Sequence, residues 1–146
     1  MESESSAAFT LTGQGLDPDQ VTVAAGIAPS VTWRTGDLVH PKATVRYQHN
    51  GWSVRSSLGP AADLEEHVTA VLDQLQAGWE ALEELSGYQD AEVACTIYSY
   101  GGDRPAIHFT EDTIARIARL HAAVDVDLYV LPARTSTAKP RSETST

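Results

Sequence analysis

The segment Val124-Asp-Val-Asp-Leu-Tyr-Val-Leu131 alternates between apolar and polar side chains from its first residue to Val130. A period of two is typical of a half-buried β-strand, because successive side chains point to opposite faces. One face carries Val124, Val126, Leu128 and Val130, and the other carries Asp125, Asp127 and Tyr129. The segment therefore predicts a strand with one face on a core and with two carboxylates and a phenol on the other face.

The rest of the chain predicts helices and further strands. Residues 63–85 are expected to form a long helix, because apolar side chains recur there at steps of three and four residues. Shorter helices are expected after Asp17-Pro18 and after Thr110, and strands at residues 8–12, 92–100 and 106–109. This order predicts an α+β fold, a two-layer sandwich in which a mixed or antiparallel sheet has its helices packed on one face.

The dipeptide Asn50-Gly51 lies between two β-like runs, which is typical of a hairpin with a two-residue type I′ turn. If these residues form the loop, Arg46 pairs directly with Arg55 on a polar strand face. Like charges in such a pair cost up to about 1 kcal/mol unless they are neutralised. We therefore expect Asp125 and Asp127 to supply the counter-charges, provided that the last strand lies near this hairpin in the same sheet.

Length and charge limit the class of protein. A chain of 146 residues predicts one domain. We expect a disordered N-terminus at residues 1–6, a globular domain at 7–132 and a flexible tail at 133–146. The 20 acidic residues against 10 basic ones give a net charge of −10, which repels nucleic acids and anionic membrane surfaces. This charge favours a basic protein partner or, alternatively, serves solubility alone.

The polar strand faces supply the candidate binding residues. They are Arg46, Arg55, Tyr98, Asp125, Asp127 and Tyr129. Tyrosine and arginine are enriched at interface cores, so this face is either a recognition surface or a structural salt network. Trp33 lies in an irregular segment and is expected to be a partly exposed aromatic residue.

The sequence predicts no catalytic residue, no metal site and no cofactor. Asp-Val-Asp supplies only two oxygen ligands where Mg²⁺ or Ca²⁺ needs more, and the five histidines lack zinc-site spacing. Cys95 is the only cysteine and is expected to be a buried thiol. Residues 1–6 do not look like a signal peptide, and no apolar run approaches the roughly 18 residues that span a bilayer, so we expect a cytoplasmic protein.

Motifs along most of the chain, up to Pro132, resemble the bacterial domain-of-unknown-function 4279 family. They are Leu16-Asp17-Pro18, Gly26-Ile27 with Pro29, Trp33 with Gly36-Asp37, Gly51-Trp52, the leucine-rich helix with His67, and Asp125-Val126-Asp127-Leu128-Tyr129. Ala25 and Val126 stand where leucine and isoleucine are more usual. The resemblance implies no catalytic residues, because the family has no established activity. Some small acidic proteins of this kind are immunity proteins beside toxins, an analogy at the level of the fold alone.

Three functions are compatible with this pattern. The first is a non-enzymatic binding module, of the immunity type, that binds a basic partner through the polar sheet face or the acidic side of the long helix. The second is a small-molecule-binding or enzymatic domain in which Arg46 and Arg55 hold an anion and Asp127 or Tyr129 transfers protons. The third is a homodimer joined through the open sheet face.

Overall fold

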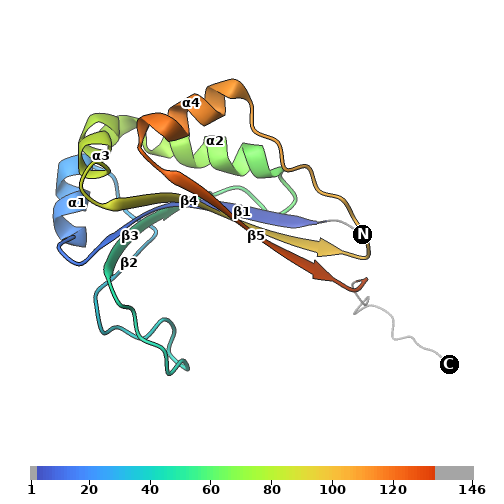
Figure 1. The fold of residues 1–146 in the computed structure, drawn as a ribbon, viewed down its shortest axis with the longest axis horizontal. Helices are drawn as coiled ribbons and strands as arrows, with labels where there is room; N and C mark the ends of the chain where they lie inside the picture. Colours follow the sequence, from blue (N-terminus) through green and yellow to red (C-terminus); the bar gives the residue numbers. More distant parts are fainter. Residues whose placement is uncertain (1–2, 134–146) are drawn as a thin grey trace.

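In the part of the chain that the structure describes, five strands form one mixed sheet in the order β2-β3-β1-β4-β5 (Figure 1). The computed structural model describes residues 3–133. The strands are β1 (Glu4–Gly13), β2 (Val31–Trp33), β3 (Asn50–Arg55), β4 (Asp90–Tyr100) and β5 (Ala123–Leu131). The pairs β1–β3, β1–β4 and β2–β3 are antiparallel, whereas β5 runs parallel to β4. The expected α+β fold with a mixed sheet is confirmed.

Among the described residues, four helices cover one face of this sheet and leave the other face open (Figure 1). They are α1 (Pro18–Ala25), α2 (Leu64–Gln74), α3 (Trp79–Leu85) and α4 (Glu111–Arg119). The expected single helix over residues 63–85 is two helices, separated by the 3-10 helix η1 (Gln76–Gly78). Helix α1 packs closely against this break, since a Cβ at Gly78 would lie 2.3 Å from the carbonyl oxygen of Ala25. Sequence periodicity could not reveal this contact, because it is not local.

The helix ends follow the residue types that predict them. Asp17 caps α1 through a 3.0 Å bond from the Asp19 N–H to its side chain, and Gly26 ends the helix in the left-handed region at φ 67°. At the start of α2, the Asp63 N–H donates to the Glu66 carboxylate over 2.8 Å as part of a capping box.

The core lies between the helices and the covered face of the sheet. Every second residue of β1 and β4 points into it, and Phe9, Leu11 and Ile97 are completely buried. Trp52 of β3 is also completely buried, and its indole N–H donates to the Thr22 hydroxyl of α1 over 3.0 Å. These contacts fix the alternation of β1, β3 and β4, so the intervening residues lie on the open face.

The predicted hairpin at Asn50-Gly51 is wrong, because both residues lie inside β3. β3 pairs with β2 instead, with Trp33 opposite Gly51. The Trp33 ring occupies the space beside this glycine, and an added Cβ there would lie 2.0 Å from the ring. The Asn50 amide donates to the Leu16 carbonyl over 2.8 Å. Asn-Gly therefore serves close packing between segments and not a turn.

Three further expectations are corrected. β1 begins at Glu4, so part of the segment expected to be a disordered N-terminus is a strand. Residues 106–109 form no strand. The apolar face of β5 is poorly covered, with Val124, Leu128 and Val130 exposed by 43%, 47% and 71%. The expected tail at 133–146 lies almost wholly outside the described residues.

Within residues 3–133, no helix is long and apolar enough to cross a membrane.

Candidate binding site on the open face of the sheet

The open face has a floor of small side chains. Strand register places Arg55 of β3, Ala8 of β1, Ala94 of β4 and Asp125 of β5 in one row across the sheet. The row beside it contains Ser53, Thr10 and Glu92, and the hydroxyls of Thr10 and Ser53 lie 3.1 Å apart. Because the floor consists of alanine, serine and threonine, larger side chains at its borders stand above it.

Three carboxylates form one border of this floor, which we call the acidic margin: Glu92, Asp125 and Asp127. Register places Asp125 beside Ala94 and Asp127 beside Thr96, on the same face as Glu92. Burial raises the pKa of Glu92, and the charges of Asp125 and Asp127 raise it further. Among residues 3–133, no salt bridge reaches any of the three. The acidic margin is therefore a patch of repelling charges without a basic partner in the described chain.

Two stacked tyrosines extend the acidic margin toward the ends of the strands. Tyr98 and Tyr129 are opposite each other in the β4–β5 register, with ring centroids 5.1 Å apart and planes at 18°. They are 39% and 47% exposed. A cation bound at Asp127 therefore has aromatic surface within reach, which suits the long side chains of lysine and arginine.

The opposite border consists of Trp33 and the loop between β2 and β3. The ring of Trp33 stacks on Tyr47 of this loop, with centroids 4.8 Å apart and planes at 19°. The loop leaves the sheet on the side away from the helices (Figure 1). Trp33 is half-buried, as predicted for a partly exposed aromatic residue. The open face is thus bounded by aromatic residues on this side and by carboxylates on the other.

The expected charge ladder between the arginines and Asp125 and Asp127 is wrong. Arg46 lies in the β2–β3 loop and donates to the Gly36 carbonyl over 2.7 Å. Arg55 pairs with Ala8, so the two arginines are not opposite each other. Between β3 and β5 lie two further strands, which puts the backbone of Arg55 about 14 Å from Asp125 of β5 at the usual strand spacing. The aspartates are not counter-charges for the arginines.

The structure therefore brings together Tyr98, Asp125, Asp127 and Tyr129 of the six predicted binding residues. Sequence reasoning missed Glu92. The residue precedes Val93, and because Val93 and Cys95 point to the core, Glu92 lies on the polar side of β4. A hollow of about 510 Å³ lies at this end of the open face, and Thr10, Glu92 and Ala123 contribute to its wall. The acidic margin is consequently bordered by a concave surface as well as by flat sheet.

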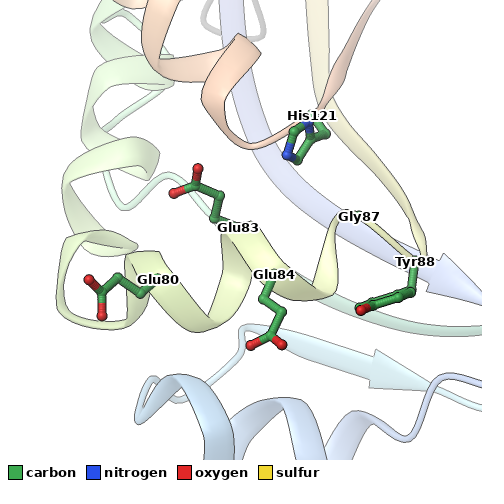
Figure 2. Close-up of a pocket in the computed structure, with 6 residues that line it drawn as sticks. All are labelled: Glu80, Glu83, Glu84, Gly87, Tyr88 and His121. Atoms are coloured by element: carbon green, nitrogen blue, oxygen red, sulfur yellow. The ribbon is translucent and has the colours of Figure 1, made fainter.

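A second acidic hollow of about 570 Å³ lies beside α3 and includes Glu80, Glu83, Glu84, Tyr88 and His121. Figure 2 shows that the three carboxylates point in different directions along the helix. Within residues 3–133, no group of three or more histidine, cysteine or acidic side chains has the geometry of a metal site. This hollow is acidic but does not converge on a common centre.

Ser56 and His67 form a partly buried pair of the residue types that serve in nucleophilic catalysis. The Ser56 hydroxyl lies 2.7 Å from His67 Nδ1, and its oxygen accepts from the Leu58 N–H over 3.1 Å. His67 is only 1% exposed, and burial lowers its pKa. A ring closed off from solvent cannot meet a substrate, so this pair holds the loop after β3 against α2.

Cys95 is a buried structural thiol, as predicted. It is 1% exposed, and burial raises its pKa to about 11, so it stays protonated at neutral pH.

The comparisons with known proteins identify a family without a known role. A family model described as a domain of unknown function (DUF4279) matches residues 3–131. No curated protein and no solved structure matches the chain. Function must therefore be argued from the site itself.

Proposed function

The chain belongs to the DUF4279 family, and we propose that it is a non-enzymatic binding module whose acidic margin binds a basic segment of a partner protein. The observation that carries this proposal is the group of carboxylates on the open face of the sheet that form no salt bridge with any residue of 3–133. Burial raises the pKa of Glu92, and repulsion from the charges of Asp125 and Asp127 raises it further. A lysine or arginine from a partner would relieve this repulsion, so binding energy is available at this position.

The charge of the whole chain supports the same class of partner. A net charge of −10 attracts a basic protein and accelerates the encounter, particularly at low salt. An immunity protein that covers a basic toxin in the bacterial cytoplasm would use such a surface. The alternative of an anion-binding or enzymatic site gains no support, because Arg46 and Arg55 do not converge.

Calorimetric titration with a hexalysine peptide tests the proposal. We expect salt-sensitive binding that weakens at least about tenfold in the double variant Asp125→Asn/Asp127→Asn, equivalent to about 1.4 kcal/mol. The matched control is Glu80→Gln/Glu84→Gln, which removes the same charge from exposed positions on α3. Equal weakening in both variants would mean attraction to net charge alone and would overturn the proposal, as would the absence of binding at low salt.

A further inference from the structure

β5 forms a long, accessible edge of the sheet. It is the last strand in the order and has nine residues, whereas β2 at the other edge has three. Within residues 3–133, no strand pairs with its outer side. Proteins usually protect such an edge with proline, a bulge or inward-pointing charge, and a short edge strand serves the same end. β5 contains no proline, glycine, lysine or arginine.

The backbone groups on this outer edge can be assigned from one hydrogen bond. The carbonyl of Leu131 accepts from the Gly101 N–H over 3.1 Å, so it points toward the β4 side. The N–H and C=O of one strand residue point to the same side, and this side alternates along the strand. Val124, Val126, Leu128 and Val130 therefore direct their N–H and C=O groups away from β4. These groups form a template for one more strand.

The side chains of β5 define what such a strand must carry. On the helix side, Leu128 and Val130 are 47% and 71% exposed. On the open side, Asp125 and Asp127 belong to the acidic margin. A strand added beside β5 would alternate in the same way, because side chains on one face of neighbouring strands are in contact. Apolar residues would match the helix side and basic residues the acidic side.

We propose that the partner binds as a sixth strand along the free edge of β5, through an extended segment in which basic and apolar residues alternate. This inference rests on the proposed function and names the partner segment and its position. Main-chain hydrogen bonds would supply affinity, and the alternation would supply specificity. A second copy of this chain fits less well, because its β5 would bring Asp125 and Asp127 to the same face and would join two chains of net charge −10.

The experiment compares two peptides against two variants. The peptides are acetyl-Lys-Val-Lys-Val-Lys-Val-Lys-amide and hexalysine. The variant Leu128→Pro removes an outward N–H, which edge strands tolerate because no bond to β4 is lost. Its control, Leu128→Ala, keeps the N–H and removes the apolar side chain. We expect Leu128→Pro to lower the affinity for the alternating peptide at least about tenfold and Leu128→Ala to lower it only a few-fold. The affinity for hexalysine should be almost unchanged in both variants.

A modified peptide keeps the test independent of how the proline variant folds. In one version the three valines are N-methylated, and in another the same number of lysines are N-methylated. Only one set of peptide N–H groups faces β5 in an added strand. One version should therefore lose affinity at least about tenfold while the other retains it. Equal affinity of the two versions would overturn the inference.

The outcomes separate this inference from the proposed function. If Leu128→Pro leaves the alternating peptide unaffected while Asp125→Asn/Asp127→Asn abolishes its binding, edge addition is wrong and the acidic margin stands. If neither Leu128→Pro nor Asp125→Asn/Asp127→Asn changes the binding of the alternating peptide, the edge addition and the proposed function are both wrong. If light scattering shows a dimer that Leu128→Pro converts to a monomer, a second copy occupies the edge and the inference is overturned.

Discussion

The two faces of the sheet have opposite properties, although they are made by alternate residues of the same strands. On the covered face, Phe9 and Val93 are opposite each other in the β1–β4 register and are almost completely buried. On the open face, the adjacent Thr10 and Glu92 are only half-buried, and Glu92 repels its neighbours. The first arrangement stabilises the fold, whereas the second places like charges together, and we propose that a partner neutralises them. The proposal therefore predicts that mutations along a single strand can change stability and binding separately.

The largest contrast should come from neighbouring residues of β1. Phe9→Ala removes a completely buried aromatic ring and should lower the free energy of unfolding by about 3–5 kcal/mol. Thr10→Ala removes only a hydroxyl that contacts Ser53 on the open face and should cost about 1 kcal/mol or less. Urea unfolding of the two variants measures both values. Similar losses for the two would contradict the division into a structural face and a binding face.

Gly51 tests whether close packing is also needed on the open face. The Trp33 ring occupies the space that a side chain would take, so Gly51→Ala should lower the free energy of unfolding by about 1–3 kcal/mol. In Trp33→Ala the space is free, and adding Gly51→Ala to that background should cost much less. A double-mutant cycle by urea unfolding measures this coupling. Additive effects would show that the ring does not exclude the methyl group.

His67, on the covered side of the sheet, should make the free energy of unfolding depend on pH. Burial lowers its pKa in the folded state below the ordinary 6.5, so the unfolded state binds the proton more readily. Stability should therefore fall as the pH drops below 6.5 toward the lowered pKa, and the part of this loss due to His67 should disappear in His67→Gln. Chemical unfolding at a series of pH values measures the slope of the free energy of unfolding against pH. His49→Gln, at an exposed position, should keep the slope of the parent protein.

Glu92 should give the smallest effect on stability and the opposite dependence on pH. Its pKa is raised in the folded state, so its contribution to stability decreases as the pH rises from the ordinary 4.5 through the raised value. Glu92→Gln should therefore increase the free energy of unfolding at neutral pH by about 0.5 kcal/mol, since it removes a charge that burial disfavours and that Asp125 and Asp127 repel. The exposed control Glu80→Gln should not do so. A loss of stability in Glu92→Gln would show that the folded protein does not disfavour the charge of Glu92.

Local patterns predicted the elements but not the contacts between distant segments. The strand at β5, the helix that begins after Asp17 and the apolar stripe of α2 depend on neighbouring residues, and these predictions are confirmed. The Asn50-Gly51 turn was wrong because the Trp33 ring from another strand uses the glycine as a packing site. The helix break at Gly78 depends on α1 in the same way.

The candidate site follows the same division between local and distant contacts. Tyr98, Asp125, Asp127 and Tyr129 were placed on one face by alternation within their own strands, and the β4–β5 register confirms this. The predicted position of Arg46 opposite Arg55 depends on the hairpin register. Because the hairpin is wrong, this position is wrong as well. The order of strands across the sheet could not be derived from alternation, which tells only the face on which a residue lies.

The most direct test of the central claim is to map where a basic peptide contacts the folded protein. Amide resonances of the isotopically labelled chain would be followed by NMR during titration with hexalysine. We expect the largest shifts to cluster in β4 and β5 around Glu92, Asp125 and Asp127, and to decrease as salt is added. Shifts centred instead on the glutamates of α3, or spread evenly over the acidic surface, would contradict the assignment of binding to the open face.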